Sequence, residues 1–576
     1  MPKTRLSKRL LTSLFIATIL TSGSAQDVDG FWTTIQDRLA ARDYLRVSGS
    51  LQASLRWNQL TGIPQRADPF AARLNAGLLV DLLGLQGPFA VAFSDGNTAY
   101  RLPAYAFYGF SPSYKWLQLH LGDRSLDFSP YTLNGHHFKG VGLELRPGNF
   151  YVGAMRGRLR RERAAEAGAI QNLDPVYRRV GSSVKVAFDD GQRQLAAILF
   201  HARDDAPSLA LPDSARLRPQ ENLVLELQGK QQLGTRFDVA FNLAHSAFTR
   251  DRTAPRLRDP GPGLHGSMLG LFRPRSATAY SQAYNFSIGF HPDFAQFQLR
   301  FERLGAGYRS LGTLAFLNDT EQLSLGGSTS LLNQKVTLDA RLGLQRNGLA
   351  AQATTAGTRL IGSLQLGVAV SERLTGSVAL SNFNYTLRQR ISTVPFVVVD
   401  SVVIVQSNLS IQLAATYLLG REKSSTLALA TAYQTASTIT ADQVETTTDN
   451  AFYSAVASYS YSLPRRQLSI TAAAIANRSD FGSIRTILLS PSLALQKELV
   501  KDQWTLEAGA AYSGVRSPGG PTNRVWESRL GLAWALSKRQ ALRLDGTYVY
   551  NRAADPTATA TTFQDWNGNL NYRLSF

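Results

Sequence analysis

The segment Tyr44–Trp57 reads YLRVSGSLQASLRW and sets the expectation for the rest of the chain. Apart from Gly49, every second residue from Leu45 to Trp57 is apolar, and Arg, Ser and Gln fill the positions between them. Successive residues of an extended strand point to opposite faces, so the segment predicts a strand with one apolar and one polar face.

The same alternation returns along the chain in residues 335–345, 503–513 and 565–576. These segments run to about 10–12 residues, whereas strands of soluble sandwiches are usually about 5–6 residues long. The longer span is what a tilted strand needs to cross a bilayer. The alternation therefore favours strands that span a membrane over the strands of a soluble sandwich.

The connections between such segments alternate between short and long. Short breaks include Ser111–Ser113 and Pro147-Gly148, and long ones include residues 160–179, 203–220 and 436–450. Short periplasmic turns and long extracellular loops are typical of outer-membrane barrels. The pattern predicts an all-β fold in which residues 44–576 form one large antiparallel transmembrane β-barrel of about 26 strands (24–26).

The first residues have the order of an export signal. Four basic residues lie within the first nine, an apolar run follows, and Gly23-Ser24-Ala25 ends the segment. We predict a signal peptide over residues 1–25. Residues 26–43 then form a short periplasmic segment in which Phe31, Ile35 and Leu39 share one face of a helix.

The composition excludes several classes of function. The chain contains no cysteine, so disulfide scaffolds, Cys-ligated zinc and thiol catalysis are ruled out. Its net charge is +19, but no nucleic-acid-binding motif accompanies the basic residues. We expect no cofactor and no nucleic-acid partner.

The end of the chain resembles the assembly signal of bacterial outer-membrane β-barrel proteins. Leu570, Tyr572, Leu574 and the terminal Phe576 form an amphipathic strand that ends on an aromatic residue. The resemblance implies a porin-like or large transport barrel in the outer membrane of a Gram-negative bacterium. Its partners would be the lipid bilayer, lipopolysaccharide and the barrel-assembly machinery.

Two known families of large barrels fit the sequence less well. TonB-dependent transporters carry a large N-terminal plug domain, whereas only about 18 residues precede the first predicted strand here. The lipopolysaccharide-insertion barrel is similar in strand number, but that family has a folded periplasmic domain and cysteines. No subfamily is identified.

The longest loop, residues 247–277, is rich in arginine. If it folds inward, its cations line a constriction and favour anionic solutes. The alternative is a basic loop at the cell surface that faces the phosphates of lipopolysaccharide. The candidate constriction residues are Arg250, Arg252, Arg256, Arg258, Arg273 and Arg275.

Charges of both signs fall on the polar face of the predicted strands. Most of them are expected to neutralise one another on the wall of the lumen, and Arg56 is expected to approach Asp565 where the first and last strands meet. This charge ladder comprises Arg46, Arg56, Arg341, Asp339, Glu507, Glu527, Arg529, Arg543, Asp545, Asp565 and Arg573.

Sites for chemistry are few. His136-His137 lies near Asp123 and Asp127, but adjacent residues of an extended chain point apart and make a poor metal-binding set. We expect no metal and no enzymatic activity. The same loop carries Phe128, Tyr131, Leu133 and Phe138, which suggests that it folds on itself or into the lumen.

Three functions are open at this point. The first is a channel for hydrophilic solutes, with anionic solutes favoured if the arginine-rich loop folds inward. The second is an export or assembly barrel that conducts a secreted polymer, protein or lipid together with a periplasmic or secretion partner. The third is a surface anchor whose loops bind other molecules.

Overall fold

The structure is a computed structural model. It describes residues 33, 35–42, 44–65, 68–95, 105–164, 175–209, 217–259, 261, 263–313, 318–349, 357–387, 404–420, 425–439, 450–482, 484–516, 522–552 and 562–576. The signal peptide predicted over residues 1–25 lies outside this part of the chain. No helix in the described part is long and apolar enough to cross a membrane.

Almost every described segment is a β-strand. The first half contains β1 (Leu45–Thr61), β2 (Phe70–Leu82), β3 (Leu85–Ser94), β4 (Tyr105–Phe110), β5 (Ser113–Tyr114), β6 (Leu117–Ser125), β7 (Leu133–Asn134), β8 (His137–Leu145), β9 (Phe150–Arg160), β10 (Arg178–Asp189), β11 (Arg193–Asp205), β12 (Glu221–Leu233), β13 (Phe237–Thr249), β14 (Thr278–Phe290) and β15 (Ala295–Leu304). The second half contains β16 (Gly312–Thr313), β17 (Thr320–Leu331), β18 (Val336–Asn347), β19 (Gly357–Ala369), β20 (Leu374–Leu387), β21 (Ile404–Leu419), β22 (Ser425–Ile439), β23 (Asn450–Leu463), β24 (Leu468–Phe481), β25 (Ile484–Val500), β26 (Trp504–Arg516), β27 (Asn523–Ser537), β28 (Gln540–Arg552) and β29 (Phe563–Ser575). Two short 3-10 turns are η1 (Ala206–Ser208) and η2 (Pro464–Arg466).

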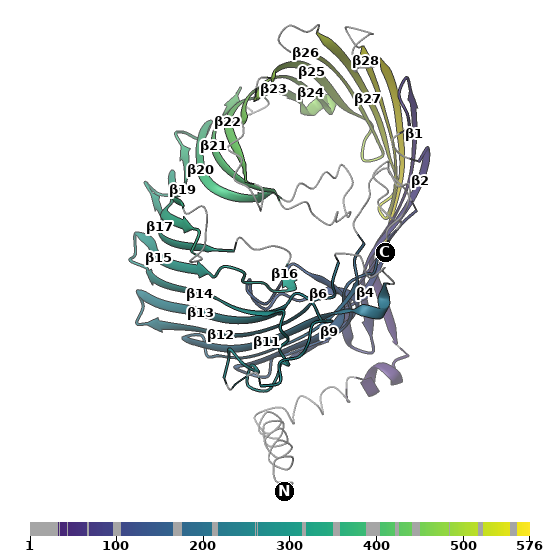
Figure 1. The fold of residues 1–576 in the computed structure, drawn as a ribbon. Helices are drawn as coiled ribbons and strands as arrows, with labels where there is room; N and C mark the ends of the chain where they lie inside the picture. The colour runs from purple at the N-terminus through teal and green to yellow at the C-terminus, as the bar shows by residue number, and fades with distance from the viewer. Residues whose placement is uncertain are drawn as a thin grey trace.

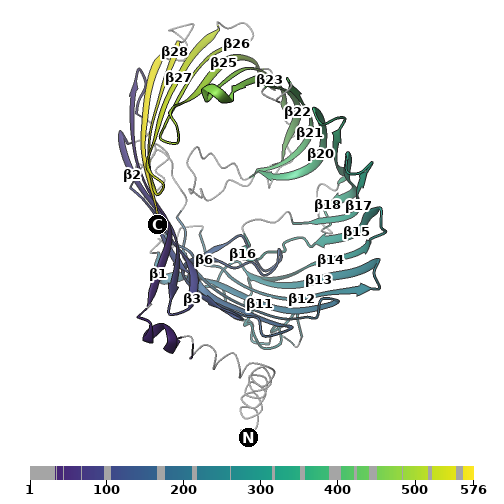
Figure 2. The ribbon, with the colours of Figure 1, turned by 180° about the vertical axis from the view of Figure 1, so that it is seen from behind.

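All strands except β7 and β16 form one closed antiparallel sheet, which appears as a ring in Figures 1 and 2. Within it each strand pairs with the next strand of the sheet along the chain, and β29 pairs antiparallel with β1 from Ser50↔Ser575 to Thr61↔Gln564. Because β4 and β5 share one position between β3 and β6, the closed barrel has 26 strands. Closure leaves no sheet edge with unpaired backbone groups. The predicted fold and strand number are confirmed.

One turn lies elsewhere than the sequence predicted. Ser111–Ser113 does not reverse the chain; the reversal is at Lys115-Trp116, where Tyr114 pairs with Leu117. Pro112 has no N–H to donate, so it interrupts the strand between β4 and β5 without ending it. Lys115 takes the left-handed backbone conformation, at φ 47°, that the tight turn requires.

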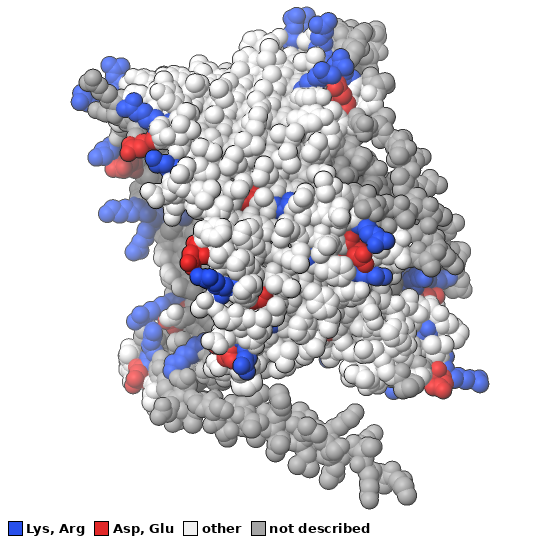
Figure 3. Space-filling model, turned by 90° about the vertical axis from the view of Figure 1, so that its left-hand side faces the viewer, with Lys and Arg blue, Asp and Glu red and all other residues white. Residues whose placement is uncertain are grey.

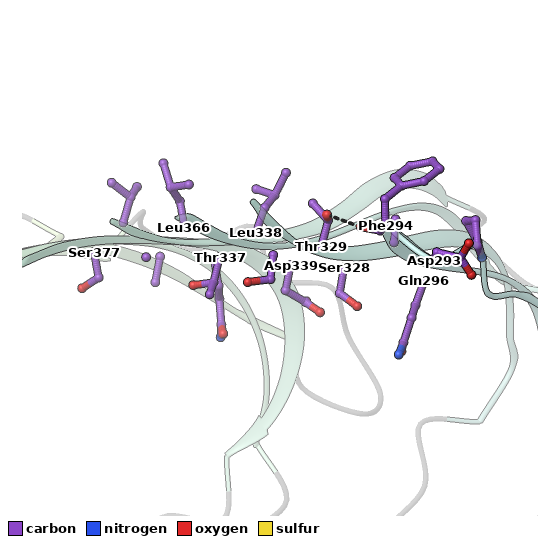
Figure 4. A pocket seen from close by; sticks show the side chains of 17 residues that line it. Asp293, Phe294, Gln296, Ser328, Thr329, Thr337, Leu338, Asp339, Leu366 and Ser377 are labelled. Atoms are coloured by element: carbon purple, nitrogen blue, oxygen red, sulfur yellow. Dashed lines mark hydrogen bonds between the residues drawn. The ribbon is translucent and has the colours of Figure 1, made fainter. Parts of the chain in front are cut away.

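The two faces of the sheet differ as the alternation predicted. In Figure 4, Leu338, Leu366 and Phe294 point to one side of the sheet, while Asp339 and Ser377 point to the other. The hollow of about 790 Å³ bordered by these residues takes side chains from both faces, so it belongs to the curved wall and is not an enclosed site. Figure 3 shows that one side of the exterior is largely free of charge, with charged side chains gathered mainly toward its edges.

Aromatic pairs form two bands on the exterior. Trp504 and Trp534 stack near the short turns, with ring centroids 4.7 Å apart. Tyr512 and Trp526 pair at 4.6 Å nearer the long loops. Eight residues separate Trp504 from Tyr512, which is roughly 26 Å along a strand and roughly 20 Å across the membrane at a tilt of about 40°. The bands therefore match the aromatic girdles that flank the apolar belt of a membrane barrel.

A short helix precedes the barrel, at residues 35–40. It lies at the end of the barrel that carries the short turns, where Arg38 Nη2 donates to Asp81 Oδ2 at 3.3 Å. Asp81 also accepts from the Gly84 amide in the β2–β3 turn. The helix is thus tied to the rim and does not fill the lumen (Figure 1).

Candidate functional site: the lumen and its inner platform

Two of the long loops enter the lumen and pack on its wall. They are residues 126–136, between β6 and β8, and residues 305–313, after β15, and we call them together the inner platform. The strands β7 and β16 in these loops pair in parallel, Leu133 with Gly312 and Asn134 with Thr313. Both views place β16 inside the ring (Figures 1 and 2). For the loop that carries Phe128 and Tyr131, folding on itself and folding into the lumen were both expected, and the structure shows that it enters the lumen.

The platform and the wall beneath it share an apolar core. Many inward positions on β8–β15, where the alternation predicts polar residues, are apolar here and are buried beneath the platform. The platform contributes Leu126, Phe128, Tyr131, Leu133, Tyr308 and Leu311, and the wall contributes Phe138, Met155, Leu159, Ile198, Phe200, Ala202, Val224, Ala244, Phe248, Ala283 and Leu304. Burial of this area makes the platform a fixed part of the wall on this side of the lumen.

Asn222 fixes the second infolded loop to the wall. Its side chain is fully buried and donates to Ser246 Oγ at 2.9 Å, to the Ala247 carbonyl at 3.0 Å and to the Arg309 carbonyl at 3.2 Å. Its Oδ1 accepts from the Leu311 amide at 3.0 Å. The amide group therefore satisfies backbone groups of the loop that would otherwise be buried without partners.

Carboxylates of the wall fix the first infolded loop. Tyr131 donates to Glu302 Oε1 at 2.5 Å, and Ser129 donates to Glu226 Oε1 at 2.6 Å. Burial, together with the nearby charge of Glu302, raises the pKa of the Tyr131 hydroxyl well above its usual range. Tyr131 therefore stays a neutral donor at physiological pH.

The opposite wall has a different character. On β20–β24 the inward positions whose side chains are described carry Ser, Thr, Ala, Gln and Asn with a few apolar residues, and none of them is charged. Ser410, Gln412, Thr471 and Asn477 are examples. Small uncharged polar side chains leave a wide and wettable surface that offers no strong point of attachment.

The charge ladder continues on β26–β28. Arg543 donates to Glu507 Oε2 at 2.6 Å and to Asp545 Oδ1 at 2.9 Å. Gly531 lies between these two carboxylates in the register, where a Cβ would come within 3.4 Å of Arg543 Nη2. Glu527 pairs with Arg529 on β27. Opposite charges on this arc thus neutralise one another in adjacent pairs.

The remaining ladder residues meet polar neighbours on adjacent strands. Asp565 accepts from Asn58 Nδ2 at 2.6 Å and faces Leu60 in the register of β1 and β29, whereas Arg56 faces Asn569. Arg46 faces Asp81 in the register of β1 and β2, and Arg573 faces Gln52. On β18, Asp339 faces Ser328 of β17 and Arg341 faces Ser363 of β19. A role for this set in selecting solutes stays a prediction.

The arginine-rich loop between β13 and β14 packs against the exterior of the barrel in its middle part. Met268 and Phe272 are buried against Leu223 and Ala247, which belong to the outward face of β12 and β13. Tyr280 Oη donates to the Gly266 carbonyl on the same side. This placement favours the surface alternative for that part of the loop.

The six arginines of this loop differ in their contacts. Arg252 donates to Glu221 Oε2 at 3.4 Å and to the Asp204 carbonyl, and Arg275 donates to the Ala254 carbonyl at 2.7 Å. The other four are exposed, and they are Arg250, Arg256, Arg258 and Arg273. An anion constriction built by these residues stays a prediction.

A serine, a histidine and a carboxylate lie in line near the short turns. Ser111 Oγ is 2.9 Å from His120 Nδ1, and His120 Nε2 is 3.0 Å from Glu144 Oε1. The order resembles a hydrolase triad, but all three side chains are buried, so a substrate has no access to the hydroxyl. The chain of bonds instead ties the β4–β5 interruption to β6 and β8. Among the described residues, no group of three or more His, Asp or Glu is placed to hold a metal ion.

Sequence reasoning missed the loop of residues 305–313 and the wall positions that hold it. One signal was available: Asn222, Val224 and Phe248 stand at inward positions where strand alternation predicts contact with water. A buried Asn beside large apolar residues on a lumen face indicates that something covers them.

Comparisons with known proteins do not identify a family for this chain. No known family and no curated protein matches the chain. Among solved structures, the ferric preacinetobactin receptor BauA of Acinetobacter baumannii is 10% identical, with 92% of this chain and 81% of that chain covered and a TM-score of 0.37. The translocation pore of the P pilus usher PapC is 9% identical over 92% of this chain and 100% of that chain, with a TM-score of 0.40. OccAB2 of A. baumannii is 9% identical over 67% and 97%, with a TM-score of 0.28.

These scores are too low to support an argument, so the class of the protein rests on its own geometry. A closed sheet of 26 strands leaves no open edge in lipid, and here it combines an apolar outward face and aromatic girdles with a polar lumen. The protein is a β-barrel of the outer membrane of a Gram-negative bacterium.

Proposed function

We propose that the protein is a conduit for hydrophilic solutes across the outer membrane. One observation supports this most: the platform covers the wall on β8–β15, while the small uncharged polar wall on β20–β24 lies on the other side of the lumen (Figure 1). A polar surface facing a partly filled lumen supports the passage of water-soluble molecules.

The size of the barrel supports the same proposal. Each tilted strand takes roughly 6 Å of perimeter, so 26 strands would enclose a round cylinder roughly 50 Å across. The platform narrows this space on one side, because its two loops are packed inside the wall. The free cross-section is therefore set by the platform as well as by the strand number.

The test is conductance of the purified protein in planar bilayers. We expect steady ohmic steps from the folded protein and none from the same preparation after heat unfolding. A correctly folded protein that stays silent under both polarities would contradict the proposal.

An export conduit is the second candidate, and the breadth of the uncharged wall on β20–β24 favours it. A secreted polymer can slide along such a surface without being held at charged sites. Purification from native membranes separates the two candidates. A silent barrel that copurifies with a periplasmic or secreted partner supports export, whereas a conducting barrel that purifies alone supports the channel.

Replacing arginines of the β13–β14 loop tests whether they give a conducting barrel a preference for anions. We propose replacing Arg250, Arg256, Arg258 and Arg273 together with Gln, since these four are exposed and the described part of the chain shows no side-chain hydrogen bond or ion pair for them. A fall in anion-to-cation permeability supports a constriction. An unchanged ratio assigns these side chains to the cell surface.

A further inference from the structure

Five arginines point outward from consecutive strands at the loop end of the barrel. They are Arg478 on β24, Arg485 on β25, Arg516 on β26, Arg524 on β27 and Arg552 on β28. The register places them on the exterior: Arg478 and Arg516 both pair with Ile487, and Arg524 pairs with Gly514 and Arg552. Ile487 is an exposed apolar residue of the outer face. We call this set the arginine belt.

The belt lies directly above the aromatic girdle. Arg524 lies two residues before Trp526 on the same face, and Arg552 lies two residues after Tyr550. Two residues correspond to about 6.6 Å along a strand. Arg478 also lies over the ring of Tyr453, 5.3 Å from its centroid. The belt therefore stands at the level where the apolar membrane interior gives way to lipid headgroups.

The charges of the belt are largely unbalanced. Asp480 accepts from Arg478 at 2.7 Å and from Arg485 at 3.0 Å, and it is the acidic residue that the belt contacts. Within the described part of the chain, no acidic side chain forms an ion pair with Arg516, Arg524 or Arg552. Five arginines against one aspartate leave four positive charges on a patch four strand spacings wide, or about 19 Å.

Arg524 and Arg552 form a pair of like charges within the belt that a bound anion would stabilise. Arg524 and Arg552 stand directly opposite each other on β27 and β28, and both are exposed. Like charges directly opposite on neighbouring strands destabilise a sheet. An anion that bridges the two guanidinium groups reverses the sign of that interaction, and phosphate suits the planar fork of arginine.

We propose that the arginine belt on β24–β28 is a binding site for the phosphates of a phosphorylated glycolipid of the outer leaflet, of the lipid A type. The headgroup would sit on the belt and the acyl chains would run down the apolar exterior past Tyr512 and Trp526. This proposal rests on the membrane location of the barrel and is independent of what the lumen conducts.

The test compares two variants of the full protein purified in neutral detergent. Arg524→Gln together with Arg552→Gln removes the opposed pair, and Lys497→Gln is the matched control. Lys497 is also exposed on the outward face, but it lies at the other end of β25, beside the short turns. The probe is bisphosphorylated lipid A, and binding is measured by native mass spectrometry and by the rise in thermal unfolding midpoint.

We expect the double variant to bind lipid A at least about tenfold more weakly than the unmodified protein, and Lys497→Gln to bind it normally. Lipid A without phosphates should bind all three proteins weakly, and inorganic phosphate at millimolar concentration should not displace lipid A. Without lipid, the double variant should be as stable as the unmodified protein or more so, because a like-charge pair is gone.

Three results would overturn the proposal. One is equal binding of lipid A by the double variant and the unmodified protein. Another is an equal loss of binding in Lys497→Gln, which would point to general attraction by positive charge. The third is displacement of lipid A by inorganic phosphate, which would make the belt a site for free anions. A loss of stability in the double variant without lipid would show that Arg524 and Arg552 support the fold itself.

Discussion

Gly568 shows how a single residue supports the closing seam of the barrel. It lies opposite Trp57 in the β1–β29 register, and a Cβ at this position would come within 1.7 Å of the Trp57 ring. Because Gly568 has no side chain, the Trp57 indole can lie over it on the exterior of the barrel. Covering a strand glycine with a cross-strand aromatic ring is a known device for fixing register.

We predict that Gly568→Ala displaces Trp57 and lowers the unfolding midpoint in urea. The loss should correspond to about 1–3 kcal/mol, the usual cost of forcing a side chain into an occupied space. Gly546→Ala is the control, because Gly546 faces Gly568 on β28 and the nearest atom to its added Cβ would be 3.9 Å away. Equal midpoints for the two variants would show that the ring adapts without cost.

Asn222 allows a second prediction at the level of one side chain. Asn222→Leu keeps the branched shape of the side chain but removes the partner of the Leu311 amide, and it leaves the Arg309 carbonyl with the bond from Ser246 alone. A buried amide without a partner costs about 1–3 kcal/mol, so the loop of residues 305–313 should be held less firmly against the wall. Limited proteolysis within that loop should become faster, and single-channel conductance should rise.

The control for this prediction is Ser324→Ala on β17. Ser324 is also a buried polar residue, but the described part of the chain shows no hydrogen bond from it to the loop of residues 305–313. Its proteolysis pattern should stay that of the unmodified protein. Unchanged proteolysis in Asn222→Leu would mean that the apolar core alone holds the platform in place.

At the level of elements, the strands could be predicted from the sequence and the infolded loops only in part. Alternation fixes a strand because the period of two is local, and the closing pair follows from the need to leave no edge in lipid. The loop with Phe128 and Tyr131 showed its inward folding by its apolar residues. The loop of residues 305–313 did not, because its partners Asn222, Val224 and Phe248 come from strands distant in sequence.

Strand β25 contains an interruption that the alternation does not reveal. Its register with β26 runs to Leu489↔Gly514 and resumes at Ser492↔Ala511, so Ser490 and Pro491 fall in the gap. Pro491 keeps its pairing with Ala474 on β24. Because proline lacks an N–H, it cannot donate the ladder bond toward β26.

We predict that Pro491→Ala stabilises the barrel. Losing proline costs about 0.4–1 kcal/mol through the unfolded chain, whereas a backbone group left unpaired in lipid costs several kcal/mol. The urea midpoint in detergent should therefore rise. Leu493→Ala, two residues further on the same face, should not raise it. A lower midpoint for Pro491→Ala would show that β25 needs the proline ring for its local geometry.

The barrel closes only when its first and last strands pair, although β1 and β29 lie at opposite ends of the sequence. Twelve residue pairs connect β1 with β29, and Phe576 extends the seam by exchanging two backbone bonds with Gly49, at 2.8 and 3.0 Å. Phe576 is therefore both a part of the seam and the last residue of the predicted assembly signal, Leu570, Tyr572, Leu574 and Phe576.

Two variants, deletion of Phe576 and Phe576→Ala, distinguish its role in the seam from its role in the assembly signal. Alanine keeps both backbone bonds, whereas the deletion removes them, at about 0.5–1.5 kcal/mol each. If the aromatic ring is the signal, both variants should reach the outer membrane several-fold less than the unmodified protein, measured as the heat-modifiable folded band. Both should still refold from urea into detergent micelles, because twelve register pairs remain and no assembly machinery is needed there. Normal assembly of Phe576→Ala together with poor refolding of the deletion variant would instead assign the residue to the seam. Phe576 would then serve closure of the barrel and not recognition by the assembly machinery.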